Sequence, residues 1–148
     1  AMAQQAKADY LFFLDSDMYI PPDTITRFLS HDKDIIGANY RKRSEKFLLA
    51  STENIDSPKE LVEHGLLPAF FLPTGCLLIK MSVFNHLTPP FFFFGLRTQD
   101  NDPKSAVFGE DYVFSIQAIK AGYKLWFDMD VTQKVKHIGQ RPYTLGSD

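Results

Sequence analysis

Two carboxylates, Asp15 and Asp17, follow an apolar segment and are separated by a single residue. Carboxylate oxygens are hard ligands that suit Mg²⁺ and Mn²⁺, and open α/β sheets bind their ligands beyond the carboxyl ends of strands. A cation held at this point would bridge phosphate groups. Asp and Ser also form turns readily, so a strand-end turn without a metal is the alternative interpretation.

A second acidic pair, Glu110 and Asp111, stands directly before a segment with helical apolar spacing. Carboxylates near a helix N-terminus are stabilised by the helix dipole, so helix stabilisation alone is one interpretation of this pair. The other is that Asp111 accepts the proton of an incoming hydroxyl group, which is the work of a general base.

His137 lies near the end of the chain, after a segment that is expected to be extended. A neutral imidazole is a frequent ligand of borderline metals such as Mn²⁺, although a histidine of the surface or core is the alternative. We predict that Asp15, Asp17 and His137 converge on one cation, and that Asp111 opens onto the same cleft without binding the metal.

Apolar patterning predicts the elements that must position these residues. Strands are predicted at 10–14, 34–40, 47–50, 67–72, 76–79 and 123–127, and 131–137 should be a strand or an extended segment. The continuous apolar run at 10–14 predicts a buried parallel strand. Helices should begin near Pro22, at Ser82 as a capping residue, and at Glu110. Residues 51–58 are expected to be a loop, and 94–107 a long irregular loop and candidate lid.

The order of these elements predicts one α/β domain over residues 1–148, with a mixed central sheet flanked by helices. The formal net charge of -2 provides no basic field for nucleic acid. A single cysteine, Cys76, excludes an internal disulfide and favours a reducing compartment, so a cytoplasmic location is predicted. The longest uncharged stretch, 65–79, is shorter than the ~20 residues that a membrane helix needs, so no transmembrane segment is expected.

The order of four motifs resembles that of GT-A glycosyltransferases, particularly family-2-like enzymes. The resemblance spans Ala8 to Gly139 and rests on Asp15-Ser16-Asp17, Pro73-Thr74-Gly75-Cys76, Gly109-Glu110-Asp111 and His137-Ile138-Gly139. It implies a GT-A-like fold and the transfer of a sugar from a nucleotide-diphosphate donor to an acceptor hydroxyl. It also implies dependence on Mn²⁺ or Mg²⁺ and inversion at the anomeric carbon.

The resemblance further implies a role for each matched residue. Asp17 would be a direct metal ligand, His137 the third metal position, and Asp15 a contact to the cation or the ribose. Asp111 would be the catalytic base and Glu110 an acceptor contact. The remaining residues would contact the substrates: Thr74, Gly75 and Cys76 in the sugar and acceptor pocket, and Arg141 at the diphosphate.

GT-A enzymes place a nucleotide-binding βαβ region before the strand that ends in the paired aspartates. Nine residues precede Tyr10, whereas a βαβ unit takes ~30 or more. We therefore expect the chain to represent the metal-binding and acceptor half of such an enzyme. One sheet edge would then be uncovered, and a second copy of the chain could pair along it.

Two other functions fit parts of the pattern. Haloacid-dehalogenase-like phosphohydrolases also carry paired aspartates after an apolar strand, and Asp15 would then be a covalent nucleophile and Asp17 an acid. Against this interpretation, Tyr19 stands two residues after Asp17, where those enzymes have threonine. The third possibility is a non-catalytic carbohydrate-binding fragment.

Overall fold

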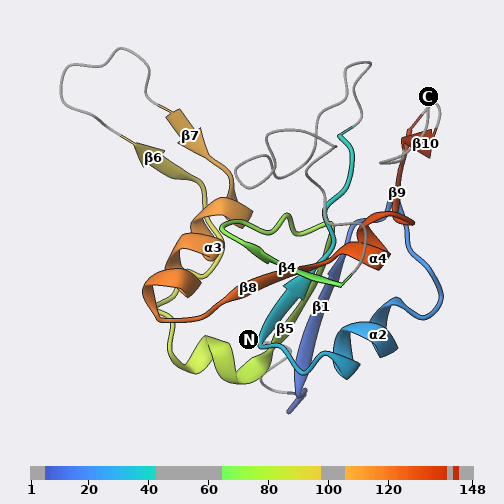
Figure 1. Cartoon of the computed structure of the whole chain (residues 1–148). Coiled ribbons are helices and arrows are strands. Elements are labelled where there is room, and N and C mark those ends of the chain that lie inside the picture. The colour runs from blue at the N-terminus through green and yellow to red at the C-terminus, as the bar shows by residue number, and fades with distance from the viewer. Residues whose placement is uncertain (1–5, 43–64, 98–105, 140–141, 144–148) are drawn as a thin grey trace.

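The computed structural model describes residues 6–42, 65–97, 106–139 and 142–143. They form a mixed α/β structure around a five-stranded sheet, with α3 on one side and α2 and α4 on the other (Figure 1). The strand order is β1-β5-β3-β8-β4. These strands are Tyr10–Leu14, Cys76–Lys80, Ile35–Gly37, Leu125–Asp128 and Leu66–Ala69. Only β3 and β8 pair in parallel. The predicted mixed sheet with flanking helices is confirmed.

Alternation along the strands explains the two halves of the core. Successive side chains of a strand point to opposite faces, so neighbouring residues enter different clusters. In β3, Ile35 packs with Phe114 of α3 (Glu110–Lys120), whereas Ile36 packs with Phe28 of α2 (Thr24–Ser30). The same alternation runs through β5 and β8. Both faces of the sheet are therefore covered, and the strands need continuous apolar sequence.

The prediction of a parallel, buried strand at 10–14 was wrong in direction and position. β1 pairs antiparallel with β5 and lies at an edge of the sheet among the described strands. Its residues are partly buried, and Leu14 is exposed. A continuous apolar run reports only that both faces are covered, because helices cover the faces of edge strands as well. Pairing of this edge with a second copy stays a prediction.

A small second sheet pairs the segment that follows β1 with two segments late in the chain. Its order is β10-β9-β2, formed by Pro142–Tyr143, Lys136–Ile138 and Met18–Tyr19. Part of the predicted extended segment 131–137 is instead helical: α4 spans Met129–Thr132. The reason is the Asp128 side chain, which accepts hydrogen bonds from the first backbone N–H groups of α4 and caps it.

The remaining elements agree in part with those predicted from the sequence. Helix α3 begins at Glu110, as predicted, and Gly122 just beyond its end has φ of 90°. The expected long loop 94–107 contains a hairpin of β6 (Gly95–Arg97) and β7 (Ala106–Phe108), and 98–105 lie outside the described residues. Ser82 does not cap a helix, because it lies within the 3-10 helix η2 (Met81–Asn85). The predicted strand 47–50 and loop 51–58 fall outside the described residues.

Within the described ranges, none of the helices combines the length and the apolar character needed to span a lipid bilayer.

Candidate functional site

The strand-end turn after β1 lies against the turn that precedes β5. The backbone N–H of Asp15 donates to the carbonyl oxygen of Gly75 at 3.2 Å, and the N–H of Met18 donates to the carbonyl of Asp15 at 3.1 Å. This turn leaves the Asp15 side chain exposed and the Asp17 side chain partly buried. The turn that carries the paired aspartates and the Gly75 turn are therefore adjacent, and the predicted sugar pocket stays a prediction.

Asp17 and His137 meet across the β2–β9 pairing, although 120 positions separate them. The N–H of Ile138 donates to the carbonyl of Asp17 at 2.7 Å, which fixes the two segments in register. The His137 Nε2 atom lies 3.3 Å from Asp17 Oδ2. Asp17 and His137 therefore lie side by side, whereas the cation site predicted for them stays a prediction.

The hydrogen-bond partner of the His137 Nδ1 atom indicates which ring nitrogen carries the proton. Nδ1 lies 3.3 Å from the carbonyl oxygen of Arg41, which can only accept a hydrogen bond. Nδ1 must therefore carry a proton, and a neutral ring presents the Nε2 lone pair to the Asp17 carboxylate. A doubly protonated ring would instead donate from Nε2 to that carboxylate. A carbonyl that orients a histidine in this way is a usual outer partner of metal ligands.

Asp15 does not join this pair as a third ligand in the structure. Over the described ranges, no three side chains of histidine, cysteine, aspartate or glutamate are grouped closely enough to hold a metal ion. Any cation at Asp17 and His137 would therefore take its other ligands from substrate oxygens and water, which Mg²⁺ and Mn²⁺ commonly accept.

Tyr40 connects this pair to the Gly75 turn. Its side chain is buried, and its ring packs edge-on against His137 with 5.5 Å between ring centroids. The backbone N–H of Gly75 donates to the Tyr40 hydroxyl at 3.1 Å. Burial and the charge of Asp15 raise the pKa of Tyr40, and the charge of Asp111 adds to the shift. Sequence reasoning missed Tyr40, because nothing in the pattern at the end of β3 indicates which loop its side chain reaches.

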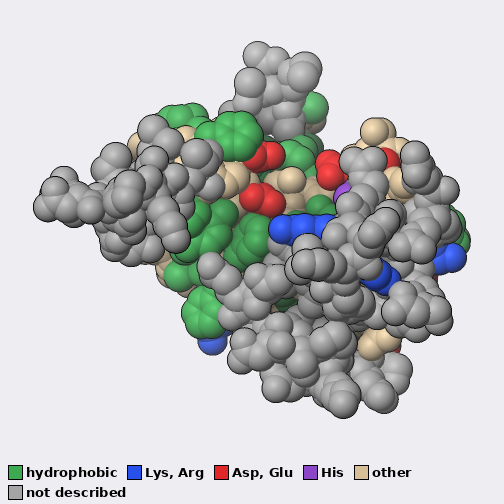
Figure 2. Space-filling view, turned by 90° about the horizontal axis from the view of Figure 1, so that it is seen from above, with side chains coloured by type: hydrophobic (Ala, Val, Ile, Leu, Met, Phe, Trp, Pro, Cys, Tyr) green, Lys and Arg blue, Asp and Glu red, His purple; other side chains and the backbone are tan. Residues whose placement is uncertain are grey.

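Asp111 lies in the first turn of α3, where its Oδ1 accepts the backbone N–H of Tyr112 at 2.8 Å. Burial raises the pKa of Asp111, and the charge of Glu110 raises it further, whereas the Tyr112 N–H and the charge of Lys42 oppose this. The charges of Asp15 and Asp111 both raise the pKa of Tyr40. Figure 2 shows acidic side chains gathered on this upper face beside a histidine and basic side chains.

The other sequence-predicted residues lie as follows. Glu110 starts α3 and Thr74 is partly buried in the turn before β5. Cys76 is fully buried within the sheet, where burial raises the pKa of its thiol to about 12. Its side chain therefore faces the core, and only its backbone is available to a pocket. Arg141 lies outside the described residues.

Replacing Asp111 by Asn is expected to stabilise the fold at neutral pH. Because the folded-state pKa is raised, the neutral carboxyl group favours folding in acid, and this contribution is lost as the pH rises through the folded pKa. An amide cannot ionise, so the melting temperature of Asp111→Asn should exceed that of the wild type at pH 7 and match it near pH 3. Asp32→Asn is the control of opposite sign, because Lys80 lowers the pKa of Asp32. A lower melting temperature for Asp111→Asn at pH 7 would contradict the burial argument.

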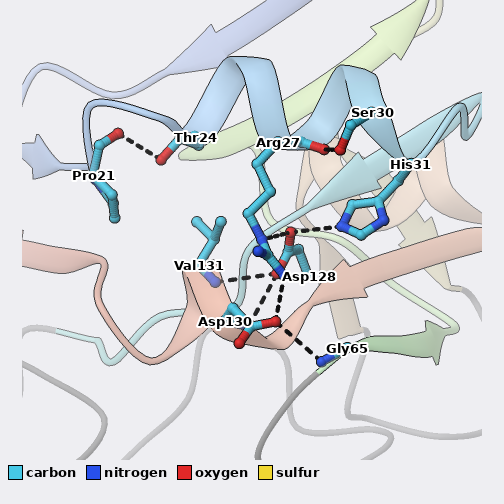
Figure 3. Close-up of polar contacts among 9 residues, drawn as sticks. All are labelled: Pro21, Thr24, Arg27, Ser30, His31, Gly65, Asp128, Asp130 and Val131. Carbon is cyan, nitrogen blue, oxygen red and sulfur yellow. Dashed lines mark hydrogen bonds and ion pairs between the residues drawn. The ribbon is translucent and has the colours of Figure 1, made fainter.

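A second polar cluster lies outside this site and is structural. The buried Asp128 carboxylate is contacted by Arg27 Nε at 2.6 Å and His31 Nε2 at 3.0 Å, and it accepts the N–H groups of Asp130 and Val131 (Figure 3). Arg27 also pairs with Asp130. Every oxygen of Asp128 thus has a partner, so the cluster fixes α2 against α4 and leaves no oxygen of Asp128 for a ligand.

No protein-family model matches the chain, and no curated protein matches it. Among solved structures, the fold is similar to the crystal structure of A197 from STIV, with a TM-score of 0.59 and 13% sequence identity. The similarity covers 99% of this chain and 71% of A197. At this identity the comparison establishes a likeness of fold, and it extends over nearly the whole chain.

Proposed function

We propose that the chain is the metal-binding and acceptor half of a GT-A-type glycosyltransferase that uses a nucleotide-diphosphate sugar and Mn²⁺ or Mg²⁺. The observation that carries the proposal is the Asp17–His137 pair, with Nδ1 of His137 turned to a backbone carbonyl and Nε2 turned to Asp17. A carboxylate and an oriented imidazole are a suitable donor set for Mn²⁺. A bound cation would stabilise the negative charge of the leaving diphosphate.

The chain's own residues would carry the other steps. Asp111 takes the proton from the acceptor hydroxyl while the acceptor oxygen forms its bond to the anomeric carbon. The bond from that carbon to the diphosphate oxygen breaks, and the diphosphate leaves with the electron pair. A raised pKa suits Asp111 to this task, because a carboxylate that ionises less readily is a stronger base. Attack from the side opposite the diphosphate inverts the anomeric carbon.

The neighbouring residues have supporting roles in this proposal. Glu110 contacts the acceptor, and Asp15 contacts the cation or the ribose. Thr74 and the backbone of Gly75 and Cys76 border the sugar, and Arg141 contacts the diphosphate. The contact between the Asp15 and Gly75 turns is consistent with one donor lying across both.

The phosphohydrolase alternative receives no support from a specific contact. It requires Asp17 to act as an acid on a leaving group near Asp15, whereas Asp17 is turned toward His137. A carbohydrate-binding fragment would bind sugar equally well after chelation of divalent cations, which separates it from the transferase.

Loss of either member of the pair should abolish metal binding. Removal of an outer partner of a metal ligand lowers affinity by about 10- to 100-fold, so Asp17→Ala and His137→Ala should each lower Mn²⁺ affinity at least about 100-fold. The measurement is Mn²⁺ titration followed by electron paramagnetic resonance, with and without a panel of nucleoside diphosphates. His86→Ala is the matched control, since His86 contacts Tyr123 elsewhere. Unchanged Mn²⁺ affinity in both folded variants would remove the metal site and the proposed mechanism.

A further inference from the structure

We propose that the hydroxyl group of Tyr40 binds a hydroxyl of the transferred sugar and so helps to select the donor, an inference that rests on the proposed function. Tyr40 connects two parts of the site, because its ring contacts His137 and its hydroxyl contacts the Gly75 turn. Its ligand would be the sugar moiety of a nucleotide sugar rather than the nucleotide.

The Tyr40 hydroxyl accepts one hydrogen bond, and its capacity to donate one is not used by a described residue. A phenolic hydroxyl can accept and donate, and its accepting side is taken by the N–H of Gly75. No described residue accepts the proton of this hydroxyl, although the side chain is only 8% exposed. A buried donor without an acceptor is destabilising, so its retention at this position calls for an explanation.

The close approach of Gly75 shows that the position of the hydroxyl is narrowly defined. A Cβ atom added at Gly75 would lie 2.3 Å from the Tyr40 oxygen, so only glycine allows this contact. The turn 73–75 therefore holds the Tyr40 hydroxyl against the backbone that we propose borders the sugar.

The surrounding charges favour a hydroxyl ligand over a phosphate. Asp15 and Asp111 both act electrostatically on the Tyr40 oxygen. An anionic phosphate would be repelled by two carboxylates, whereas a sugar hydroxyl can accept from Tyr40 and donate to a carboxylate. This combination of one donor and two acceptors is typical of polyol recognition, in which each hydroxyl is both donor and acceptor.

Tyr40→Phe tests the proposal, because it keeps the ring against His137 and removes only the hydroxyl. A neutral hydrogen bond contributes about 0.5–1.5 kcal/mol, so affinity for the nucleotide sugar with Mn²⁺ should fall about 3- to 10-fold. Affinity for the matching nucleoside diphosphate with Mn²⁺ should change less than about twofold, since that ligand has no sugar to contact. Equilibrium titration measures both, and Tyr10→Phe, at the far end of β1, is the matched control.

Two further measurements keep the test decisive. Tyr40→Phe leaves the Gly75 N–H without its acceptor, so thermal unfolding must show that the variant is folded before affinities are compared. Gly75→Ala displaces the hydroxyl without removing it and should produce the same selective loss. An equal loss of affinity for the nucleoside diphosphate and the nucleotide sugar, or no loss of affinity for either, would overturn the proposed role of Tyr40. Neither result would contradict the proposed function of the chain. If the wild type binds no nucleoside diphosphate with Mn²⁺, the proposed function falls and this inference falls with it.

Discussion

In the intact enzyme, replacing Asp111 by Asn is expected to slow sugar transfer by about three orders of magnitude while leaving metal and donor affinity nearly unchanged. A positioned general base contributes about 10²- to 10⁴-fold to a rate, and asparagine keeps the shape of the side chain without its basicity. Because Asp111 lies at the helix start rather than in the Asp17–His137 pair, its loss should affect kcat and not the binding of Mn²⁺.

The experiment compares the release of nucleoside diphosphate with the donor dissociation constant for the same preparations. Asp32→Asn is a suitable control for the loss of one carboxylate, since Asp32 pairs with Lys80 at the exposed surface. A large loss of rate, together with the expected gain in stability at neutral pH, would show that the partly buried Asp111 carboxylate lowers the stability of the fold but is needed for catalysis. A fall in donor affinity as large as the fall in rate would instead identify Asp111 as a ligand of the donor or its metal.

Replacing Arg27 by Ala is expected to lower the free energy of unfolding by about 3–5 kcal/mol. The Asp128 side chain is fully buried, and Arg27 Nε lies 2.6 Å from it (Figure 3). Removing one partner of a buried ion pair is strongly destabilising, because the buried Asp128 charge then keeps only His31 and two backbone N–H groups. The hydrogen bond to Asp128 raises the pKa of Arg27, so the guanidinium is charged throughout the accessible pH range.

Denaturant unfolding of Arg27→Ala beside Lys80→Ala separates this effect from a general loss of positive charge. Lys80 pairs with Asp32, whose side chain is 83% exposed, and such surface pairs contribute little to stability. A second variant, Arg27→Met with Asp128→Asn, keeps the accepting oxygen at the start of α4 and removes the charge. It should recover part of the lost stability. If Arg27→Ala and Lys80→Ala lowered the free energy of unfolding by similarly small amounts, the Asp128 charge would not depend on Arg27 for its stabilisation.

The order of the elements and the positions of the chemically important residues along them could be predicted from the amino-acid sequence. Asp15 follows the first apolar strand, and Asp111 stands at the start of the long helix, as the patterns predicted. These features were accessible because they depend on local physics: strands covered on both faces need continuous apolar residues, and helix starts favour acids. The approximate strands at β3, β4, β5 and β8 follow from the same rule.

The pairing of the strands and the contacts between distant side chains could not be predicted and are visible only in the folded chain. β2 and β9 contain two and three residues, too few for a periodic signal, yet their pairing brings Asp17 to His137. The helix at Met129–Thr132 replaced an expected extended segment because the Asp128 cap is itself fixed by Arg27, 101 positions earlier. Tyr40 gained its place in the site from contacts with Gly75 and His137. Hydrogen bonds and burial between distant segments carry no signature in local sequence, because each residue acquires those neighbours only when the chain is folded.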